Sequence, residues 1–274
     1  MRVDTPLIRF IKGKGGNTQK QIEMETGVKI KFPLSKEETS IVAEGSSVGN
    51  VSRASEQADY SHFISLPLAV HPGLVEKLQN FQNSILGNLD SSQDLGIDKS
   101  IFINPKTFHL TVLMLKLWNE ERVAAAAEVL QKVSPKVMKA LKDRPISIRL
   151  KGLDCMRGSV SEACVLYTPV EEIGGEGRLM RACQVIIDAY VKAGLVLQKD
   201  ACRKLKLHGT VMNVKFRKRT VRTRKIGSFD AHDIFEQYGS EEWGEYVIGE
   251  AHLSQRFKYD RSGYYHRCAS IPFP

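Results

Sequence analysis

The sequence predicts an α+β protein of two domains, a small α/β domain over residues 1–59 and a larger two-lobed domain over residues 60–274. The length of 274 residues exceeds what one small core requires, so both pieces can bury a core. The first piece reads helix, glycine turn, helix, strand, strand, helix. In the second piece, His-x-Thr followed by an apolar residue occurs twice, at 109–112 and at 208–211.

A glycine-rich turn separates the two helices expected at the N-terminus. It consists of Gly13, Lys14, Gly15 and Gly16, and a polar, helix-like run to Glu25 follows it. Glycines let a backbone approach phosphates closely, and the N-terminus of the next helix offers free amides. Lys12, Lys14 and Lys20 add positive charge. The turn therefore indicates a phosphate-binding loop, although an ordinary surface loop is the alternative.

The rest of the small domain reads as two strands and a helix. Strands are expected at Val28–Phe32 and at Ile41–Gly45. Apolar residues then recur at spacings of three and four, as on one side of a helix: Val48, Val51, Ala54 and Ala58. Because residues 1–6 alone precede the first helix, an opening strand is short or missing.

In each half of the large domain a strand, a helix and a motif strand are expected in this order. The predicted strands, besides those of the motifs, are His62–Leu68, Ile146–Leu153, Cys164–Val170, Tyr246–Phe257 and Tyr264–Ile271. The predicted helices are one opened by Pro72, with Leu74, Leu78, Phe81 and Ile85 on its apolar side, one over Glu120–Leu141, and one over Leu179–Ala193. Similar element order before each motif predicts two quasi-equivalent lobes.

Each motif presents an imidazole beside a hydroxyl. In a strand, alternate side chains share a face, so His109 emerges with Thr111, and His208 with Thr210. Both motifs lie in runs apolar enough to be buried strands. Two histidines from distant segments can face each other across one cleft, which a single local motif cannot achieve.

This residue set suits acid–base catalysis on a phosphodiester. A neutral imidazole accepts a proton from an attacking oxygen, and a protonated one gives a proton to a leaving oxygen. Threonine hydroxyls can donate hydrogen bonds to the non-bridging phosphate oxygens. Such chemistry needs no metal or cofactor, and we expect none. The alternative is that all four are strand residues with ordinary hydrogen bonds.

The charge of the chain favours a polyanionic partner. Forty basic and 31 acidic residues give a formal net charge of +9. Six of the nine residues from 217 to 225 are cationic, beginning with Arg217, Lys218 and Arg219, directly downstream of the second motif. We expect this segment to follow the phosphates of a longer RNA, the alternative being a solvated loop.

Cysteine usage predicts an intracellular protein. The five cysteines form no C-x-x-C pair and no zinc-ligand spacing, so we interpret them as reduced thiols. We expect no signal peptide and no membrane span. Tyr259, Tyr264 and Tyr265 could stack a base near the cleft, but packing in a closing hairpin is the favoured interpretation.

The doubled motif resembles the two-histidine phosphoesterase superfamily, over roughly residues 60 to 274. The resemblance implies a bilobal fold with two pseudo-symmetric antiparallel sheets and outer helices. It also implies that His109 and His208 are general acid and base, and that Thr111 and Thr210 bind phosphate. Which histidine is the acid stays open. The implied substrates are 2′,3′-cyclic phosphates and RNA termini.

The N-terminal domain resembles a KH domain, with Gly13–Gly16 as the G-x-x-G loop that clamps single-stranded nucleic acid. The two halves together resemble the activating signal cointegrator complex subunit one family. This resemblance rests on KQIEMET at 20–26, IFINPK at 101–106, Met212-Asn213 and LSQRF at 253–257. It implies a nuclear location, with the cytoplasm as the alternative. It also implies single-stranded RNA and a helicase-containing cointegrator complex as partners, in transcription and alkylation-damage responses.

Three functions remain open on the sequence. The leading hypothesis is an RNA-binding, metal-independent phosphodiesterase that acts on an RNA phosphodiester or 2′,3′-cyclic phosphate at or near a 3′ end. The second is a scaffold subunit that recognises a phosphorylated RNA end without turnover. The third is a phosphodiesterase for small cyclic nucleotides, whose activity would be indifferent to Lys14 and to the basic segment.

Overall fold

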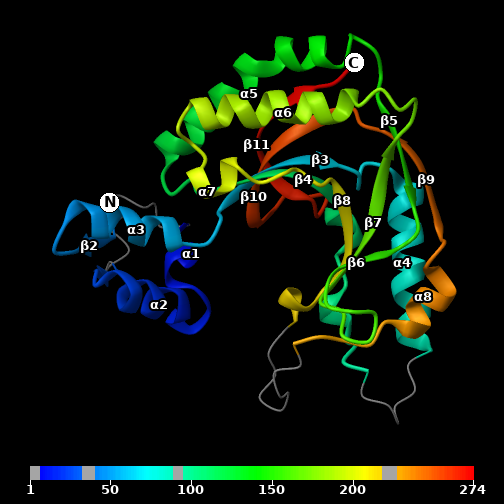
Figure 1. The fold of residues 1–274 in the computed structure, drawn as a ribbon, viewed down its shortest axis with the longest axis horizontal. Helices are drawn as coiled ribbons and strands as arrows, with labels where there is room; N and C mark the ends of the chain where they lie inside the picture. The colour runs from blue at the N-terminus through cyan, green and yellow to red at the C-terminus, as the bar shows by residue number, and fades with distance from the viewer. Residues whose placement is uncertain (1–6, 33–40, 89–94, 218–226) are drawn as a thin grey trace.

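The protein consists of a small N-terminal domain docked beside a larger domain with a curved sheet (Figure 1). The structure is a computed structural model that describes residues 7–32, 41–88, 95–217 and 227–274. The paired strands within it are antiparallel. The α+β class expected from the sequence is therefore confirmed.

The N-terminal domain has the element order that the sequence predicts. Its elements are α1 (Arg9–Lys12), a 3-10 turn (Lys14–Gly16), α2 (Asn17–Thr26), β1 (Lys29–Lys31), β2 (Val42–Glu44) and α3 (Val48–Gln57). Strand β1 pairs antiparallel with β2. Of the expected apolar side of α3, Val51, Ala54 and Ala58 pack into a separate small core, whereas Val48 is 88% exposed. The question of an opening strand falls on residues 1–6, outside the described residues.

Left-handed backbone makes the glycine turn between α1 and α2 possible. Gly13, Gly15 and Gly16 have φ values of 69°, 63° and 78°, a region that favours glycine. A Cβ at Gly13 would also collide with the Thr18 hydroxyl. In α2 the Asn17 amide donates to the Lys14 carbonyl, whereas no side chain caps the amides that follow and the first turn carries no acidic residue, so these following amides remain available to an anion.

The larger domain is a nine-stranded sheet with the order β11-β10-β3-β4-β8-β7-β5-β9, and β6 pairs with β7. Its strands are β3 (His62–Pro67), β4 (His109–Leu115), β5 (Ser147–Lys151), β6 (Asp154–Arg157), β7 (Val165–Glu172), β8 (His208–Asn213), β9 (Glu242–Val247), β10 (Glu250–Tyr259) and β11 (Tyr265–Pro272). The two sheets expected from the sequence are joined into one sheet by the pairing of β4 with β8. Each lobe is one half of this sheet.

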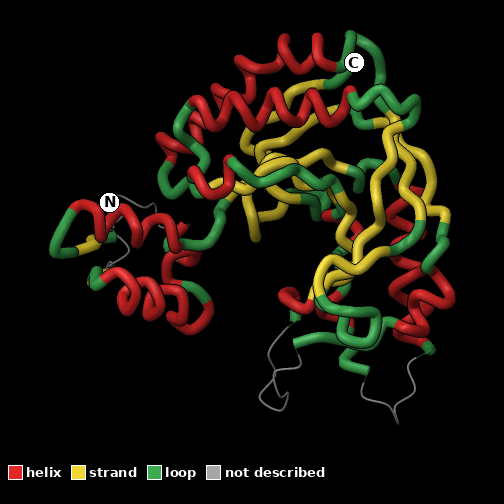
Figure 2. Tube along the Cα trace, in the orientation of Figure 1, coloured by secondary structure: helices red, strands yellow, loops and turns green. Residues whose placement is uncertain are grey.

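Helices cover the outer side of both lobes (Figure 2). They are α4 (Pro72–Gly87), α5 (Glu120–Ala140), α6 (Arg178–Lys192), α7 (Gln198–Ala201) and α8 (His232–Tyr238). Helices α5 and α6 pack together over β10, β11 and β4, whereas α4 packs against β9. The helix that follows β3 therefore covers the lobe containing β7, and the helix that follows β7 covers the lobe containing β3, which interlocks the lobes around one core.

One strand prediction is wrong. Residues Tyr246–Phe257 do not form a continuous strand but divide into β9 and β10, and β6 was not expected. The chain crosses from one lobe to the other at Ile248 and Gly249, since β9 pairs with β5 and β10 pairs with β3. Strand-like apolar residues lie on both sides of the crossing, so residue type does not reveal the change of partner.

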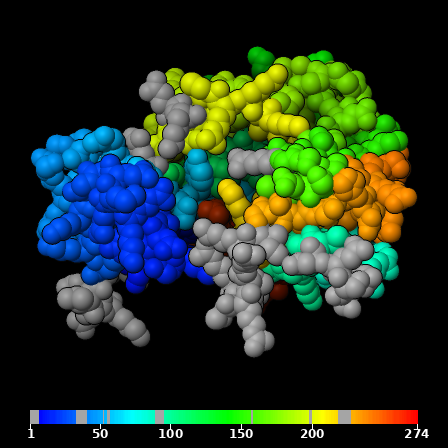
Figure 3. Space-filling model, turned by 60° about the horizontal axis from the view of Figure 1, so that its bottom comes forward, coloured from blue at the N-terminus to red at the C-terminus, as the bar shows by residue number. Residues whose placement is uncertain are grey.

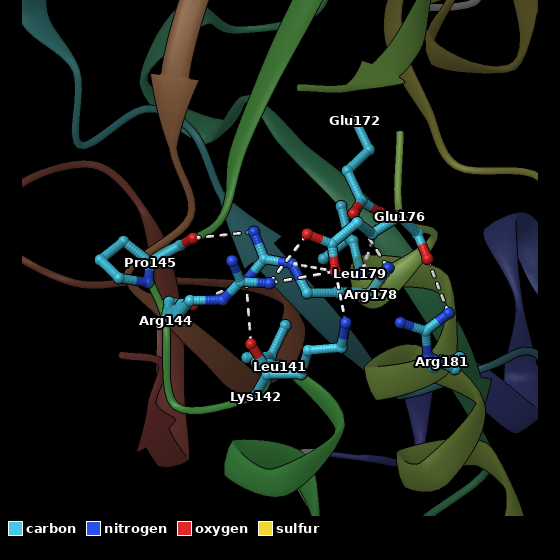
Figure 4. A network of polar contacts seen from close by, with 9 residues as sticks. All are labelled: Leu141, Lys142, Arg144, Pro145, Glu172, Glu176, Arg178, Leu179 and Arg181. Atoms are coloured by element: carbon cyan, nitrogen blue, oxygen red, sulfur yellow. Dashed lines mark hydrogen bonds and ion pairs between the residues drawn. The ribbon is translucent and has the colours of Figure 1, made fainter. Parts of the chain in front are cut away.

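A buried arginine fastens the start of α6 to the end of α5 (Figure 4). The Arg178 guanidinium donates hydrogen bonds to the carbonyl oxygens of Leu141, Arg144 and Pro145. The Glu172 carboxylate accepts hydrogen bonds from the Arg178 and Leu179 backbone amides. Carbonyls and amides that the helix ends leave without partners are thereby satisfied. The network is structural and lies outside the candidate site.

Candidate active site

The two His-x-Thr motifs lie on neighbouring strands at the centre of the sheet. Strands β4 and β8 pair antiparallel at Leu110 and Gly209, the middle residues of the two motifs. Continued by one residue either way, this register puts His109 opposite Thr210, and Thr111 opposite His208. Directly opposed side chains have Cβ atoms roughly 5 Å apart. The four candidate catalytic residues are therefore brought together.

The same four side chains share one face of the sheet. His109, Thr111, His208 and Thr210 are partly exposed, whereas Leu110 and Gly209 between them are buried. On the buried side the Phe108 ring packs directly over Gly209. Apolar packing below thus holds the polar residues toward solvent above.

The strand pairs that contain the two motifs share two features, a proline opposite the histidine and a register shift after the threonine. Pro67 of β3 pairs with His109, and Pro169 of β7 pairs with His208. In each motif strand the register shifts directly after the threonine, at Val112 and at Val211. A bulge bends and twists its strand, and bulges are common beside active sites. The predicted quasi-equivalence of the lobes therefore extends to backbone geometry.

Both histidines are held by a backbone carbonyl two residues earlier. His109 Nδ1 lies 2.7 Å from the Thr107 oxygen, and His208 Nδ1 lies 2.7 Å from the Lys206 oxygen. A carbonyl oxygen only accepts hydrogen bonds, so each Nδ1 carries the proton. In the neutral rings the lone pair is consequently on Nε2, the nitrogen free for proton transfer.

Burial makes His109 a neutral imidazole. It lowers the pKa of His109 from 6.5 to about 4, an effect that the hydrogen bond to the Thr107 carbonyl opposes and the nearby His208 reinforces. Burial disfavours the charged ring because the apolar surroundings solvate it poorly. His109 therefore has the protonation state of a general base at neutral pH.

Aromatic rings contact both histidines, and of these rings sequence reasoning considered Tyr265 but missed Phe63 and Tyr167. The Tyr265 ring meets His109 edge-on at 5.5 Å between centroids, and Phe63 lies 4.9 Å from it. On the other side the Tyr167 ring lies 5.4 Å from His208. The packing interpretation fits Tyr264, which is 8% exposed. Nothing in the spacing of these residues signals the contacts, because they arise from strand pairing.

The tyrosine beside His208 belongs to a charged network. The Tyr167 hydroxyl donates to the Asp154 carboxylate and accepts from the Lys206 ammonium. Lys206 connects this network to the imidazole, because its ammonium binds Tyr167 and its carbonyl holds the His208 ring. Burial and the Asp154 hydrogen bond raise the pKa of Tyr167, so its hydroxyl stays protonated.

The predicted RNA-binding cations separate into different groups. Lys12, Lys14 and Lys20 are exposed around the glycine turn. Arg217, by contrast, donates to Asp98 Oδ2 at 3.0 Å and to the Gly96 carbonyl at 2.7 Å, with its side chain 13% exposed. RNA binding by Arg217 stays a prediction, and it would require the guanidinium to leave its contacts with Asp98 and Gly96. Lys218 and Arg219 lie outside the described residues.

Within the described ranges, no helix is long and apolar enough to cross a membrane. Over the same residues, no group of three or more histidine, cysteine, aspartate or glutamate side chains is placed to hold a metal ion. The candidate site, as described above, contains imidazoles, hydroxyls and aromatic rings.

Residues 60–273 match the family described as the AKAP7 2'5' RNA ligase-like domain, and residues 1–59 match the KH domain. The first match covers well over half of the chain. This chain belongs to the AKAP7 2'5' RNA ligase-like family. The AKAP7 2'5' RNA ligase-like domain is thus an RNA-related domain with the two-histidine phosphoesterase-like fold, and it follows a KH domain.

Relatives of this AKAP7 2'5' RNA ligase-like chain share both halves or the second alone. Activating signal cointegrator 1 complex subunit 1 of Mus musculus is 29% identical over 97% of this chain and 81% of its own length. An uncharacterized protein of Schizosaccharomyces pombe is 28% identical over 77% of this chain and 94% of its own. The resemblance to the cointegrator subunit family is therefore confirmed. A solved structure, TT0787 of Thermus thermophilus, covers 78% of this chain and 97% of its own, with 16% identity and a TM-score of 0.48.

Proposed function

We propose that this protein binds single-stranded RNA and cleaves a phosphodiester or 2′,3′-cyclic phosphate at or near the 3′ end. The observation that carries the proposal is the pairing of Leu110 with Gly209, which puts two imidazoles and two hydroxyls on one face. Each imidazole also has its Nδ1 proton committed to a carbonyl. Two rings prepared in the same way suit one reaction with two proton transfers.

In this mechanism His109 is the base and His208 the acid. For a cyclic phosphate, His109 Nε2 takes a proton from water as the water oxygen forms a bond to phosphorus. The bond from phosphorus to the 2′ oxygen breaks, and protonated His208 gives that oxygen its proton. Thr111 and Thr210 hold the non-bridging oxygens by hydrogen bonds that strengthen as charge grows. The lowered pKa of His109 supports this assignment, because a base has to be unprotonated.

The KH domain supplies RNA binding in this proposal. The left-handed glycines, the free amides of α2 and the exposed Lys12, Lys14 and Lys20 suit a phosphate backbone. Likeness to the mouse cointegrator subunit supports a proposal about location and partners. We propose on that basis a nuclear protein that joins a helicase-containing cointegrator complex in transcription and alkylation repair.

Turnover of a labelled oligoribonucleotide with a 2′,3′-cyclic phosphate end tests the catalytic proposal. His109→Gln and His208→Gln should each lower kcat by about 10²-fold or more, and a chelator should have no effect. His232→Gln is the matched control, since this histidine is 64% exposed at the start of α8 and should leave kcat unchanged. Wild-type protein that yields no more product than a variant carrying both His109→Gln and His208→Gln would disprove catalysis. RNA binding that persists in that case would support the scaffold function.

A further inference from the structure

We infer that three rings of the C-terminal hairpin, Phe257, Tyr259 and Tyr265, form a stacking platform for RNA bases between the KH domain and His109. We call these residues the aromatic track. The inference rests on the proposed function and adds the route by which the RNA strand reaches the candidate active site. It also makes substrate length a determinant of activity.

The first ring of the aromatic track is exposed and held in an unfavourable backbone conformation. Phe257 is 53% exposed and has a φ of 59°. This region is an outlier for a bulky residue and costs on the order of 1–3 kcal/mol. One side of the ring stacks on Phe10 of α1, with 5.9 Å between centroids. Although Phe10 and the Arg256 guanidinium both contact this ring, Phe257 remains 53% exposed, and an exposed aromatic residue in a strained conformation points to a ligand.

Two residues after Phe257 in β10, Tyr259 begins a series of ring contacts that reaches the candidate active site. Tyr259 is 52% exposed, and its ring lies 5.4 Å from that of Tyr265, its partner across the hairpin. The Tyr265 ring in turn meets His109 at 5.5 Å. The aromatic track therefore begins at α1, directly before the glycine turn, and ends at a candidate catalytic side chain.

Cations accompany the exposed end of the aromatic track. The Arg256 guanidinium lies 4.6 Å from the centre of the Phe257 ring and donates a hydrogen bond to the Tyr60 carbonyl, so it packs this ring rather than binding a phosphate. The Arg9 guanidinium lies 5.2 Å from the centre of Phe10 and 5.7 Å from that of Phe257. Exposed rings interleaved with arginines are the feature by which proteins bind single strands, since bases stack on the rings and phosphates follow the charges. This charge favours RNA as the occupant over an apolar protein segment.

The C-terminal part of the chain is visible between the N-terminal domain and the second lobe (Figure 3). In Figure 3 dark red atoms of the C-terminal hairpin are visible between the blue N-terminal domain and the yellow and orange parts of the second lobe. Arg9 also donates hydrogen bonds to the carbonyls of Arg256 and Phe257, which fastens α1 to this hairpin. The glycine turn and the histidines thus keep a fixed distance from each other, and one RNA strand can contact both.

The test compares a long and a short substrate in the full chain. We would use an oligoribonucleotide of about ten nucleotides and a dinucleotide, both with a 2′,3′-cyclic phosphate end. Tyr259→Ser and Phe257→Asn should each weaken binding of the long strand about fivefold or more, as expected from lost base stacking. Asn tolerates the left-handed backbone at residue 257. Turnover of the dinucleotide should not change.

Two further variants separate stacking from a general surface effect. Tyr259→Trp keeps a ring and should retain wild-type affinity. Met180→Ser, which alters a side chain that is 41% exposed on α6, should leave binding of both substrates unchanged. Equal affinity of Tyr259→Ser, Phe257→Asn and wild type for the long strand would overturn the inference. The inference would also be overturned if these two variants bound RNA normally but lost affinity for a protein partner.

Failure of the proposed function gives a different result. If wild type turned over neither substrate, catalysis would be disproved, whereas affinity for the long strand would still test the aromatic track. Fluorescence of 2-aminopurine placed along the strand provides that readout, because stacking on a tyrosine ring quenches it. A fluorescence change in wild type that persists in Tyr259→Ser and Phe257→Asn would place the bases elsewhere.

Discussion

Leu110 of β4 pairs with Gly209 of β8, and through this pair the two halves of the sheet meet inside the two His-x-Thr motifs. The candidate active site is therefore formed at the junction of the lobes. A shift of one residue in this register would turn one histidine toward the core. The packing beneath the pair is consequently as important to the site as the histidines themselves.

Replacing Gly209 with alanine should weaken the packing where the two lobes meet. A Cβ at this position would lie 2.5 Å from Phe108 Cζ and 2.9 Å from Thr168 Cγ2, so rings or strands have to move. We expect a loss of about 1–3 kcal/mol in the free energy of unfolding. We also expect kcat of the folded variant to fall, because the two histidines move apart. Gly73→Ala is the control, since a Cβ there meets nothing within 4 Å. Unchanged unfolding in urea for Gly209→Ala would contradict this view of the junction.

The acid side of the pH–rate profile should report His109. Because burial lowers the pKa of His109 to about 4, the ring stays neutral well below pH 6.5, and kcat/KM should begin to fall only as the pH approaches this value. The measurement is kcat/KM on a cyclic phosphate from pH 8 to pH 4.5, with circular dichroism to verify folding. A half-maximal rate near pH 6.5 would contradict a base whose pKa is lowered by burial.

His62 should make the protein less stable in acid. Burial, helped by the charges of His266 and Lys258, lowers the pKa of His62 from 6.5 to about 4. Between these values the unfolded chain binds a proton that the folded chain does not, so the free energy of unfolding falls as the pH drops. His62→Phe should remove about 2 kcal/mol of the loss between pH 7.5 and pH 5, measured by urea unfolding. An identical loss in both proteins would contradict the assignment.

Arg178 should stabilise the fold far more than its neighbour Arg181. Arg178 is 7% exposed and bonds three carbonyl oxygens, so its removal leaves buried acceptors without partners. We expect Arg178→Met to lower the free energy of unfolding by about 3 kcal/mol. Arg181→Met removes an exposed hydrogen bond to the Glu176 carbonyl and should cost under about 1 kcal/mol. Similar melting temperatures for the two variants would exclude this role.

Tyr167 should act on catalysis through His208. Its hydroxyl binds Lys206, whose carbonyl holds the His208 ring, so Tyr167→Phe loosens a positioning contact and keeps the aromatic ring. We expect kcat to fall several-fold with KM nearly unchanged. Lys206→Met should reproduce the effect, because it removes the same contact. If both variants retain wild-type kcat, the network serves stability alone.

Local patterns in the chain were sufficient for much of the fold. The apolar spacing after Pro72 predicted α4, and Leu74, Leu78, Phe81 and Ile85 are all buried there. The glycine turn is likewise a local feature, because left-handed backbone at Gly13 depends on that residue itself. Where partners change along a strand, local patterns fail, as at Ile248 and Gly249.

The sequence by itself determined the two domains, the glycine turn and the identity of the four motif side chains, since these depend on spacing and residue type. Only the tertiary structure decided that Leu110 meets Gly209, that Tyr265 and Tyr167 flank the histidines, and that Arg217 is occupied by Asp98. The physical reason is that strand pairing and long-range ion pairs join residues far apart in the chain, and their energies depend on which surfaces the core brings together.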